Sequence, residues 1–248
     1  MIELKSKDEI DKIKKSCEIV KKVLYRLKDM IKPGLPTIEL DREAYRISRE
    51  HGAEPAFLNY RGFPASICVS INNEVVHGIP SQKKILKDGD IVSIDFGILY
   101  NGYYGDAAIT VPVGNVTAIA NKLIDVTREA LYKGIEKAKK GNKLFDISYA
   151  IQSYVEKNGF SVVRDFVGHG IGKKLHEEPM VPNFGKPGTG VNLETGMVLA
   201  IEPMVNEKEY EICVLDDNWT VVTKDNGLSA HFEHTVAITD NGTMILSE

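Results

Sequence analysis

Four acidic residues lie inside apolar runs of this sequence. Asp95 stands in IVSIDFGI, Glu202 in MVLAIEPM and Glu233 in HFEHTVAI, and Asp106 follows in YYGDAAITV. An ionised carboxylate in apolar surroundings is so costly that it must be paired, protonated or bound to a metal ion. Any one of these acids could simply face solvent from a half-buried strand, but that interpretation fits all four together poorly. The pattern therefore favours a buried carboxylate cluster.

Two of these acids fall on a predicted hairpin. Asn101-Gly102 between two apolar runs is the strongest short-range hairpin signal. A two-residue turn there sets position 106 opposite position 97, so Asp95 and Asp106 become diagonal neighbours on one face, roughly 7–8 Å apart at the backbone. That spacing suits two carboxylates that reach a pair of metal ions from either side, and it is too wide for direct contact between them.

Histidines in glycine-rich surroundings supply a second kind of candidate ligand. His169 is bracketed by glycines in GHGIGKKLHEEP, directly after the predicted strand segment FSVVRDFV, and His176 follows seven residues later. His77 ends the apolar run of NEVVHGIP. A lone histidine is usually structural or solvated, but these accompany a set of buried acids. We therefore treat all three as candidate site residues.

Oxygen-rich ligands with one imidazole suit Mn, Fe(II), Co or Zn at a shared two-metal site. Two such ions can lower the pKa of a bridging water and polarise a substrate carbonyl, which is the chemistry of hydrolysis. The sequence has no GxSxG, no Walker A loop, no HExxH and no GxGxxG after a strand. Metal-dependent hydrolysis is thus the reaction class that the residues favour.

Two successive runs of helix, helix and strands must position these residues. Helical spacing of apolar residues predicts helices over 7–31, 37–51, 117–140 and 146–158. Strands are predicted over 67–72, 91–99, 103–111, 160–166, 196–204, 209–214, 219–223, 231–238 and 243–246, with a functional loop at 177–196. The repeated order indicates an α+β fold with a pseudo-two-fold internal duplication, in which helices cover one face of a curved antiparallel sheet. No linker divides the halves, so we expect one catalytic domain over 1–248.

Composition excludes several other classes of protein. The chain has 248 residues and a formal net charge of −4, which gives no support to a general nucleic-acid binder. No apolar stretch is long enough for a membrane span, and the charged N-terminus is not a signal peptide. The three cysteines lie far apart, at positions 17, 68 and 213. Their spacing argues against disulfides and favours a reducing, cytoplasmic location.

In six segments the chain resembles the type I methionine aminopeptidases of the short bacterial kind, which have the pita-bread (creatinase/aminopeptidase) fold. These segments are SINNEVVHGIP (70–80), DGDIVSIDFG (88–97), GYYGDAAIT (102–110), GHGIGKKLHEEP (168–179), GMVLAIEPM (196–204) and AHFEHTVAIT (230–239). The resemblance covers essentially the whole chain. It implies an exopeptidase that removes the initiator methionine from nascent chains when the second residue is small, by attack of a metal-bridging water or hydroxide.

The resemblance also implies a role for each candidate residue. Two divalent ions (Co, Mn, Fe(II) or Zn) would be bound by Asp95, Asp106, His169, Glu202 and Glu233, with Asp106 and Glu233 bridging them. Glu202 would act as general base, His77 would hold the scissile amide nitrogen, and His176 would stabilise the tetrahedral intermediate. The methionine pocket would be lined by Tyr60, Phe63, Cys68, Leu175 and Trp219. The expected partners are nascent polypeptide N-termini, and the expected state is a monomer away from membranes.

Four positions depart from the commonest family pattern. Gly97 replaces a frequent hydroxyl-bearing residue, His231 an amide and Leu175 an aromatic, and Phe57 stands where some relatives have Cys. These departures leave the implied ligand set intact but affect the shape of the pocket.

Two alternative functions and one further interaction stay open at this level. A prolidase or aminopeptidase P shares the fold but carries an additional N-terminal domain, and a non-catalytic binding module would have lost ligands. Lysines cluster at 83, 84 and 87 and at 137, 139, 140 and 143. We favour a solvated face for both clusters over a transient contact with the ribosome, a contact that salt would weaken steeply.

Overall fold

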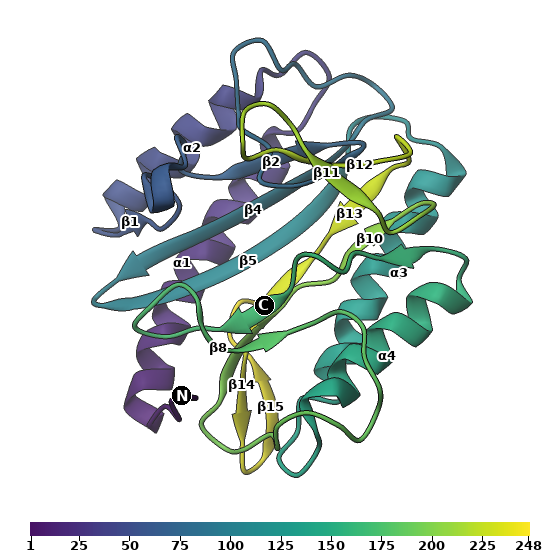
Figure 1. Cartoon of the computed structure of the whole chain (residues 1–248). Coiled ribbons are helices and arrows are strands. Elements are labelled where there is room, and N and C mark those ends of the chain that lie inside the picture. Colours follow the sequence, from purple (N-terminus) through teal and green to yellow (C-terminus); the bar gives the residue numbers. More distant parts are fainter.

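A curved antiparallel sheet forms the centre of the molecule (Figure 1). The computed structural model describes all residues, 1–248. Along the nine-stranded sheet the order is β1 (Glu54–Pro55), β4 (Ile91–Tyr100), β5 (Tyr103–Pro112), β14 (Glu233–Thr239), β9 (Val198–Ile201), β7 (Gly168–Gly170) and β8 (Glu177–Val181). Beside this path, β2 (Cys68–Ile71) pairs with β4, and β15 (Gly242–Ile245) pairs with β14.

Two small three-stranded sheets complete the β structure. One has the order β13 (Ser229–His231), β10 (Met204–Asn206) and β6 (Ser161–Val162). The other has the order β11 (Ile212–Val214), β12 (Val221–Thr223) and β3 (Glu74–Val76). A 3₁₀ turn, η1 (Tyr60–Gly62), precedes β2.

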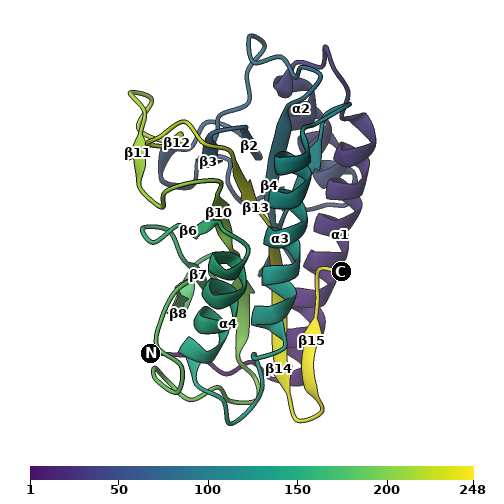
Figure 2. The same ribbon diagram turned by 90° about the vertical axis from the view of Figure 1, so that its right-hand side faces the viewer.

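Helices cover one face of the large sheet, as the view in Figure 2 shows. They are α1 (Lys7–Met30), α2 (Thr37–Glu50), α3 (Ala118–Ile135) and α4 (Leu144–Lys157). The helix α1 begins at a capping box, in which Ser6 Oγ accepts from the Glu9 N–H and Glu9 accepts from the Ser6 N–H. This reciprocal pairing satisfies two backbone donors that a helix end otherwise leaves free.

Each pair of helices has its own hydrophobic core. A cluster of 25 buried residues joins α3 and α4 to the β9 and β14 side of the sheet. A cluster of 19 buried residues joins α1 and α2 to β2 and β4. The two cores repeat the same layering of two helices against adjacent strands. The predicted α+β class, with helices covering one face of a curved antiparallel sheet, is thereby confirmed.

The predicted hairpin forms with the expected register. Asn101 and Gly102 both have positive φ, 50° and 79°, as a two-residue type I′ turn requires. Gly97 pairs with Asp106 across β4 and β5. On β4, Asp95 precedes Gly97 by two residues. The Asp95 and Asp106 carboxylates therefore share one face of the sheet.

Several boundaries differ from those that the sequence predicts. The third helix ends at Ile135 rather than near 140, and turns follow it. The expected strand over 196–204 is split into β9 and β10, and β8 occupies the start of the expected loop at 177–196. The predicted strand over 160–166 is reduced to the two residues of β6, and the three-residue β7, which has no local signal of its own, is held by long-range pairing. None of the helices combines the length and apolar character that crossing a bilayer demands.

Candidate active site

Three buried side chains converge from different strands. Asp106 on β5, His169 on β7 and Glu233 on β14 each offer a ligand atom, and these atoms all lie within 4.8 Å of one another. Their exposed fractions are 3, 5 and 3%. Pairing of β14 with both β5 and β9, and of β9 with β7, brings these distant segments side by side.

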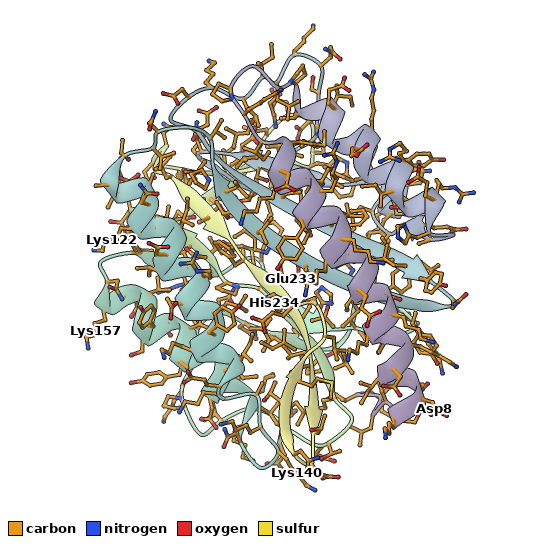
Figure 3. The ribbon with its side chains drawn as sticks, turned by 180° about the vertical axis from the view of Figure 1, so that it is seen from behind. Asp8, Lys122, Lys140, Lys157, Glu233 and His234 are labelled. Carbon is orange, nitrogen blue, oxygen red and sulfur yellow. The ribbon has the colours of Figure 1, made fainter.

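Strand alternation selects Glu233 rather than its neighbour His234. Successive residues on a strand point to opposite faces. His234 faces the helices, where its ring lies 5.9 Å from that of Tyr132 and its Nδ1 lies 2.8 Å from Ser247 Oγ. Figure 3 shows both residues on β14, seen between α1 and α3 from the helical side. Glu233 lines the cavity on the other face.

Asp95 and Glu202 extend this cluster. Asp95 projects from β4, and Glu202 follows β9 directly, with its Oε1 atom 3.6 Å from His169 Nε2. One oxygen each of Asp95, Asp106 and Glu233 is buried without a hydrogen-bond partner. Buried polar atoms are nearly always partnered, so these oxygens need a ligand that the polypeptide does not supply. Carboxylate oxygens with one imidazole are donors that fit a divalent metal ion.

The electrostatics of the cluster point the same way. Burial raises the pKa of Glu202 to about 8 and that of Asp95 to about 7, and neighbouring Glu202 adds to the shift at Asp95. Burial also raises the pKa values of Asp106 and Glu233 well above the usual range, and the other carboxylates add to both shifts. A bound cation reverses this effect because it favours the ionised acids. The protein alone therefore does not balance the charge of these carboxylates.

Neutral imidazoles surround the carboxylates. Burial lowers the pKa of His169 to about 3 and that of His77 to about 4. Desolvation also lowers the pKa of His176, and the nearby Arg61 charge adds to the shift. A neutral imidazole can ligate a metal ion or hydrogen-bond a substrate without adding charge.

Aromatic side chains position the two histidines outside the carboxylate cluster. His176 Nδ1 lies 2.8 Å from the Tyr60 hydroxyl, and its ring centroid lies 4.3 Å from that of His169. His77 has a left-handed φ of 59° and lies edge-on to Phe166 and Trp219, at centroid distances of 5.3 and 6.2 Å.

All twelve side chains that the sequence analysis selected line one cavity of about 210 Å³. They are Tyr60, Phe63, Cys68, His77, Asp95, Asp106, His169, Leu175, His176, Glu202, Trp219 and Glu233. Six further residues line it, and of these only Phe57 was expected from the sequence to affect the pocket: Phe57, Arg61, Val76, Phe166, Val167 and Met204. Apolar residues of this kind carry no sequence signal that separates a cavity wall from ordinary core. Arg61 is a charged residue next to Tyr60 in the sequence, but charged residues beside aromatic ones are common on protein surfaces and do not identify a site.

Two of the sequence departures prove to be in contact. A Cβ atom built on Gly97 would lie 2.9 Å from Cε1 of Phe57 and 3.1 Å from Oδ1 of Asp106. The large ring at position 57 therefore occupies the space that a side chain at position 97 would need. His231, a third departure, places its Nε2 atom 3.3 Å from Glu202 Oε2.

Comparisons with known proteins give a consistent result. The model of metallopeptidase family M24 matches residues 11–240. The chain is 58% identical to a methionine aminopeptidase of Clostridium perfringens over 247 residues, covering 100% of this chain and 99% of that protein. It is 53% identical to methionine aminopeptidase 1 of Bacillus subtilis, with the same coverage.

Solved structures agree with the sequence relatives. The crystal structure of a methionine aminopeptidase from Thermotoga maritima superimposes with a TM-score of 0.99 at 47% identity, and each chain is covered completely (100%). A prolidase from Pyrococcus horikoshii has a TM-score of 0.80 at 26% identity, and the match covers 99% of this chain but 63% of the prolidase. The similarity to the methionine aminopeptidase is thus both higher and complete over the two chains.

Proposed function

This chain belongs to metallopeptidase family M24, as a methionine aminopeptidase of the short bacterial type, and we propose how its residues carry out that reaction. It is a metal-dependent hydrolase that removes N-terminal methionine. The observation that supports this chemistry most directly is that ligand atoms of Asp106, His169 and Glu233 lie within 4.8 Å of one another in the wall of one cavity. Because donors come from both halves of the chain, the proposed catalytic unit is the whole of 1–248.

The five cavity residues Asp95, Asp106, His169, Glu202 and Glu233 would hold two divalent ions, of Co, Mn, Fe(II) or Zn. Asp106 and Glu233 would be central to this set, because each is buried with an oxygen that has no partner in the protein. When bound, the ions would polarise the substrate carbonyl and lower the pKa of the attacking water. All donors belong to one chain, which supports a monomer as the active form.

Glu202 is the proposed general base. It takes one proton from the water that attacks the methionyl carbonyl carbon, and it returns a proton to the leaving amine as the C–N bond breaks. Its carboxylate lies between two imidazoles, with His169 Nε2 at 3.6 Å and His231 Nε2 at 3.3 Å. A base held in this way needs little reorientation between the two proton transfers.

Two histidines outside the carboxylate cluster would orient the substrate. The Tyr60 hydroxyl can donate to His176 Nδ1, which leaves Nε2–H of His176 free to donate to the substrate carbonyl oxygen and the tetrahedral intermediate. His77 lines the same cavity beside Phe166 and would hold the scissile amide nitrogen. Burial lowers the pKa of both imidazoles from the ordinary value and so favours their neutral forms.

The apolar part of the cavity would take the methionine side chain. It is formed by Tyr60, Phe63, Cys68, Leu175 and Trp219. The Phe63 and Trp219 rings meet edge-on with centroids 5.2 Å apart. A thioether makes favourable contacts with aromatic rings and sulfur, so this wall suits methionine.

The proposed substrates are nascent polypeptides with a small second residue, and translation places them in the cytoplasm. A transient ribosome contact is the weaker part of this proposal. Lys84 pairs with Glu74 at 2.8 Å and Lys140 with Asp240 at 2.9 Å, so both lysine clusters are partly neutralised. Co-sedimentation with ribosomes at increasing salt would test it, and binding insensitive to salt would contradict an electrostatic contact.

Hydrolysis of Met-Ala-Ser by protein loaded with Mn or Co tests the function directly. We expect release of methionine, no cleavage of Xaa-Pro peptides, and loss of turnover in Glu202→Gln and His169→Ala with the folded state retained by circular dichroism. A preference for Xaa-Pro would favour a prolidase-type activity. Absence of any cleavage by the loaded protein would favour a binding module.

A further inference from the structure

His231 is a buried histidine without a partner for its outer nitrogen. It is 1% exposed, and its Nε2 atom makes no hydrogen bond within the protein. That atom lies 3.3 Å from Oε2 of Glu202. The cavity lining does not include His231, so it approaches Glu202 from behind rather than from the substrate side.

The backbone of His231 is held by one threonine hydroxyl. Thr110 Oγ1 donates to the His231 carbonyl at 2.7 Å and accepts from the His231 N–H at 2.9 Å. Ser93 Oγ lies 2.8 Å from Thr110 Oγ1. Since the single proton of Thr110 is already given to a carbonyl, Ser93 must donate, and the hydroxyl then makes one donated and two accepted bonds. A fully used hydroxyl of this kind leaves His231 little freedom to move.

We propose that His231 is a positioning residue for Glu202: its otherwise unpartnered Nε2–H, 3.3 Å from Oε2, donates to that oxygen once Glu202 is ionised. An ionised carboxylate can only accept, so the imidazole must supply the proton, and Nε2 must carry it. Ser93 on β4 thus contacts Thr110 on β5, Thr110 contacts His231 on β13, and His231 contacts Glu202, the residue after β9. It rests on the proposed role of Glu202 as general base.

This contact restrains the side of Glu202 that faces away from His169. His169 Nε2 lies near Oε1 and His231 Nε2 near Oε2, so the carboxylate is flanked at both oxygens. Groups that orient a metal-site residue from behind commonly change activity or metal affinity by 10–100-fold when they are lost. The effect should fall on the proton-transfer steps and hence on kcat.

Two substitutions at position 231 separate the hydrogen bond from packing. His231→Leu fills similar volume but has no donor, and His231→Gln keeps an N–H at similar reach. With Met-Ala-Ser and Mn-loaded protein, we expect His231→Leu to lower kcat about tenfold or more with KM within about threefold. We expect His231→Gln to recover most of that loss. Calorimetric titration with Mn and thermal melting of the metal-free proteins accompany both variants.

The ring tautomer gives a readout that does not depend on turnover. The chain has 6 histidines, so ¹⁵N resonances of the Zn-loaded protein, in which the bound cations keep Glu202 ionised, can be assigned by substitution. We expect His231 to be the neutral Nε2–H tautomer, and an Nδ1–H tautomer would overturn the proposal. Should His231→Leu fail to fold, Thr110→Val against Thr110→Ser tests the same connection, with the loss in kcat expected for valine alone.

The outcomes also separate this inference from the proposed function. If Glu202→Gln is active, Glu202 is not the general base, and the positioning role of His231 is refuted together with that assignment. Inactive Glu202→Gln beside fully active His231→Leu would leave the mechanism intact and refute the positioning role. Equal losses of kcat and thermal stability in His231→Leu and His231→Gln would assign the imidazole to packing only.

Discussion

Lys5 Nζ lies 2.6 Å from Glu177 Oε2, which joins the N-terminal segment to a residue 172 positions away. Both side chains are largely buried, with exposed fractions of 3 and 10%. The lysine stem passes over Gly172, where a Cβ atom would lie 2.4 Å from Lys5 Cε. Between Gly172 and Glu177 the chain carries Leu175 and His176, so this ion pair anchors the loop that brings two proposed substrate contacts to the cavity.

The first prediction concerns this ion pair. Lys5→Met leaves the Glu177 carboxylate buried without its cation, so the free energy of unfolding should fall by about 3 kcal/mol in urea titrations. Catalytic efficiency should fall as well, because His176 loses its anchor. Lys7→Met is the matched control, since Lys7 is exposed and makes no ion pair. An unchanged unfolding midpoint for Lys5→Met would show that the pair does not anchor the loop.

A second prediction follows from the contact between Phe57 and the position of Gly97. Gly97→Ala should reduce activity and stability because the new methyl group meets both Phe57 Cε1 and Asp106 Oδ1. Phe57→Cys clears one of these contacts, so the double variant should recover part of the loss. We expect a coupling energy of about 1 kcal/mol from a double-mutant cycle of unfolding free energies. Strictly additive effects would mean that the two positions do not communicate.

Removing one clustered carboxylate should stabilise the metal-free protein. Asp106→Asn keeps the shape of the side chain but relieves the repulsion that raises the pKa values of Asp106 and Glu233. We expect a melting temperature higher by about 2–4 °C in the presence of a chelator, as a gain of about 1 kcal/mol gives for a chain of this size. Added Mn should stabilise the unmodified protein by mass action but affect Asp106→Asn much less. A lower melting temperature for the metal-free variant would contradict this account.

The decrease in the free energy of unfolding at acid pH should depend on Glu9. Its pKa is lowered to about 2, first by the Ser6 backbone N–H and then by Lys173, from an ordinary value of 4.5. A carboxylate with a lowered pKa stabilises the fold above pH 4.5, and this contribution is lost as the pH falls towards 2. Because Glu9 is partly exposed, we expect about 1 kcal/mol.

The measurement is the free energy of unfolding of Glu9→Gln between pH 6 and pH 2. The variant should be less stable at pH 6 and should converge with the unmodified protein near pH 2. A constant difference across this range would show that the carboxylate charge is irrelevant, and that the glutamine loses something else, such as the capping geometry.

The sequence predicts the parts of this fold that depend on neighbouring residues. The capping box at Ser6, the Asn101-Gly102 turn and the register of Asp106 against Gly97 are all set within a few residues, and each forms as expected. Apolar periodicity likewise predicts the two helix pairs. Acids in apolar runs, with His169 among glycines, were enough to select every member of the buried cluster.

Long-range pairing decided what local patterns could not. Alternation along a strand says that Glu233 and His234 face opposite ways, but only pairing with β5 and β9 shows which of them faces the cavity. Strands as short as β7 exist because neighbouring strands hold them, so the sequence does not reveal them.

The sequence likewise did not show which residues the departures from the family pattern contact. The sequence identifies Gly97, Phe57 and His231 as unusual, and only the tertiary structure shows that Phe57 fills the space beside Gly97 and that His231 approaches Glu202. The physical reason is that residue type and spacing determine local backbone geometry and the cost of burying charge. Which distant side chains share that burial is decided by how the whole chain packs, as Lys5 and Glu177 show.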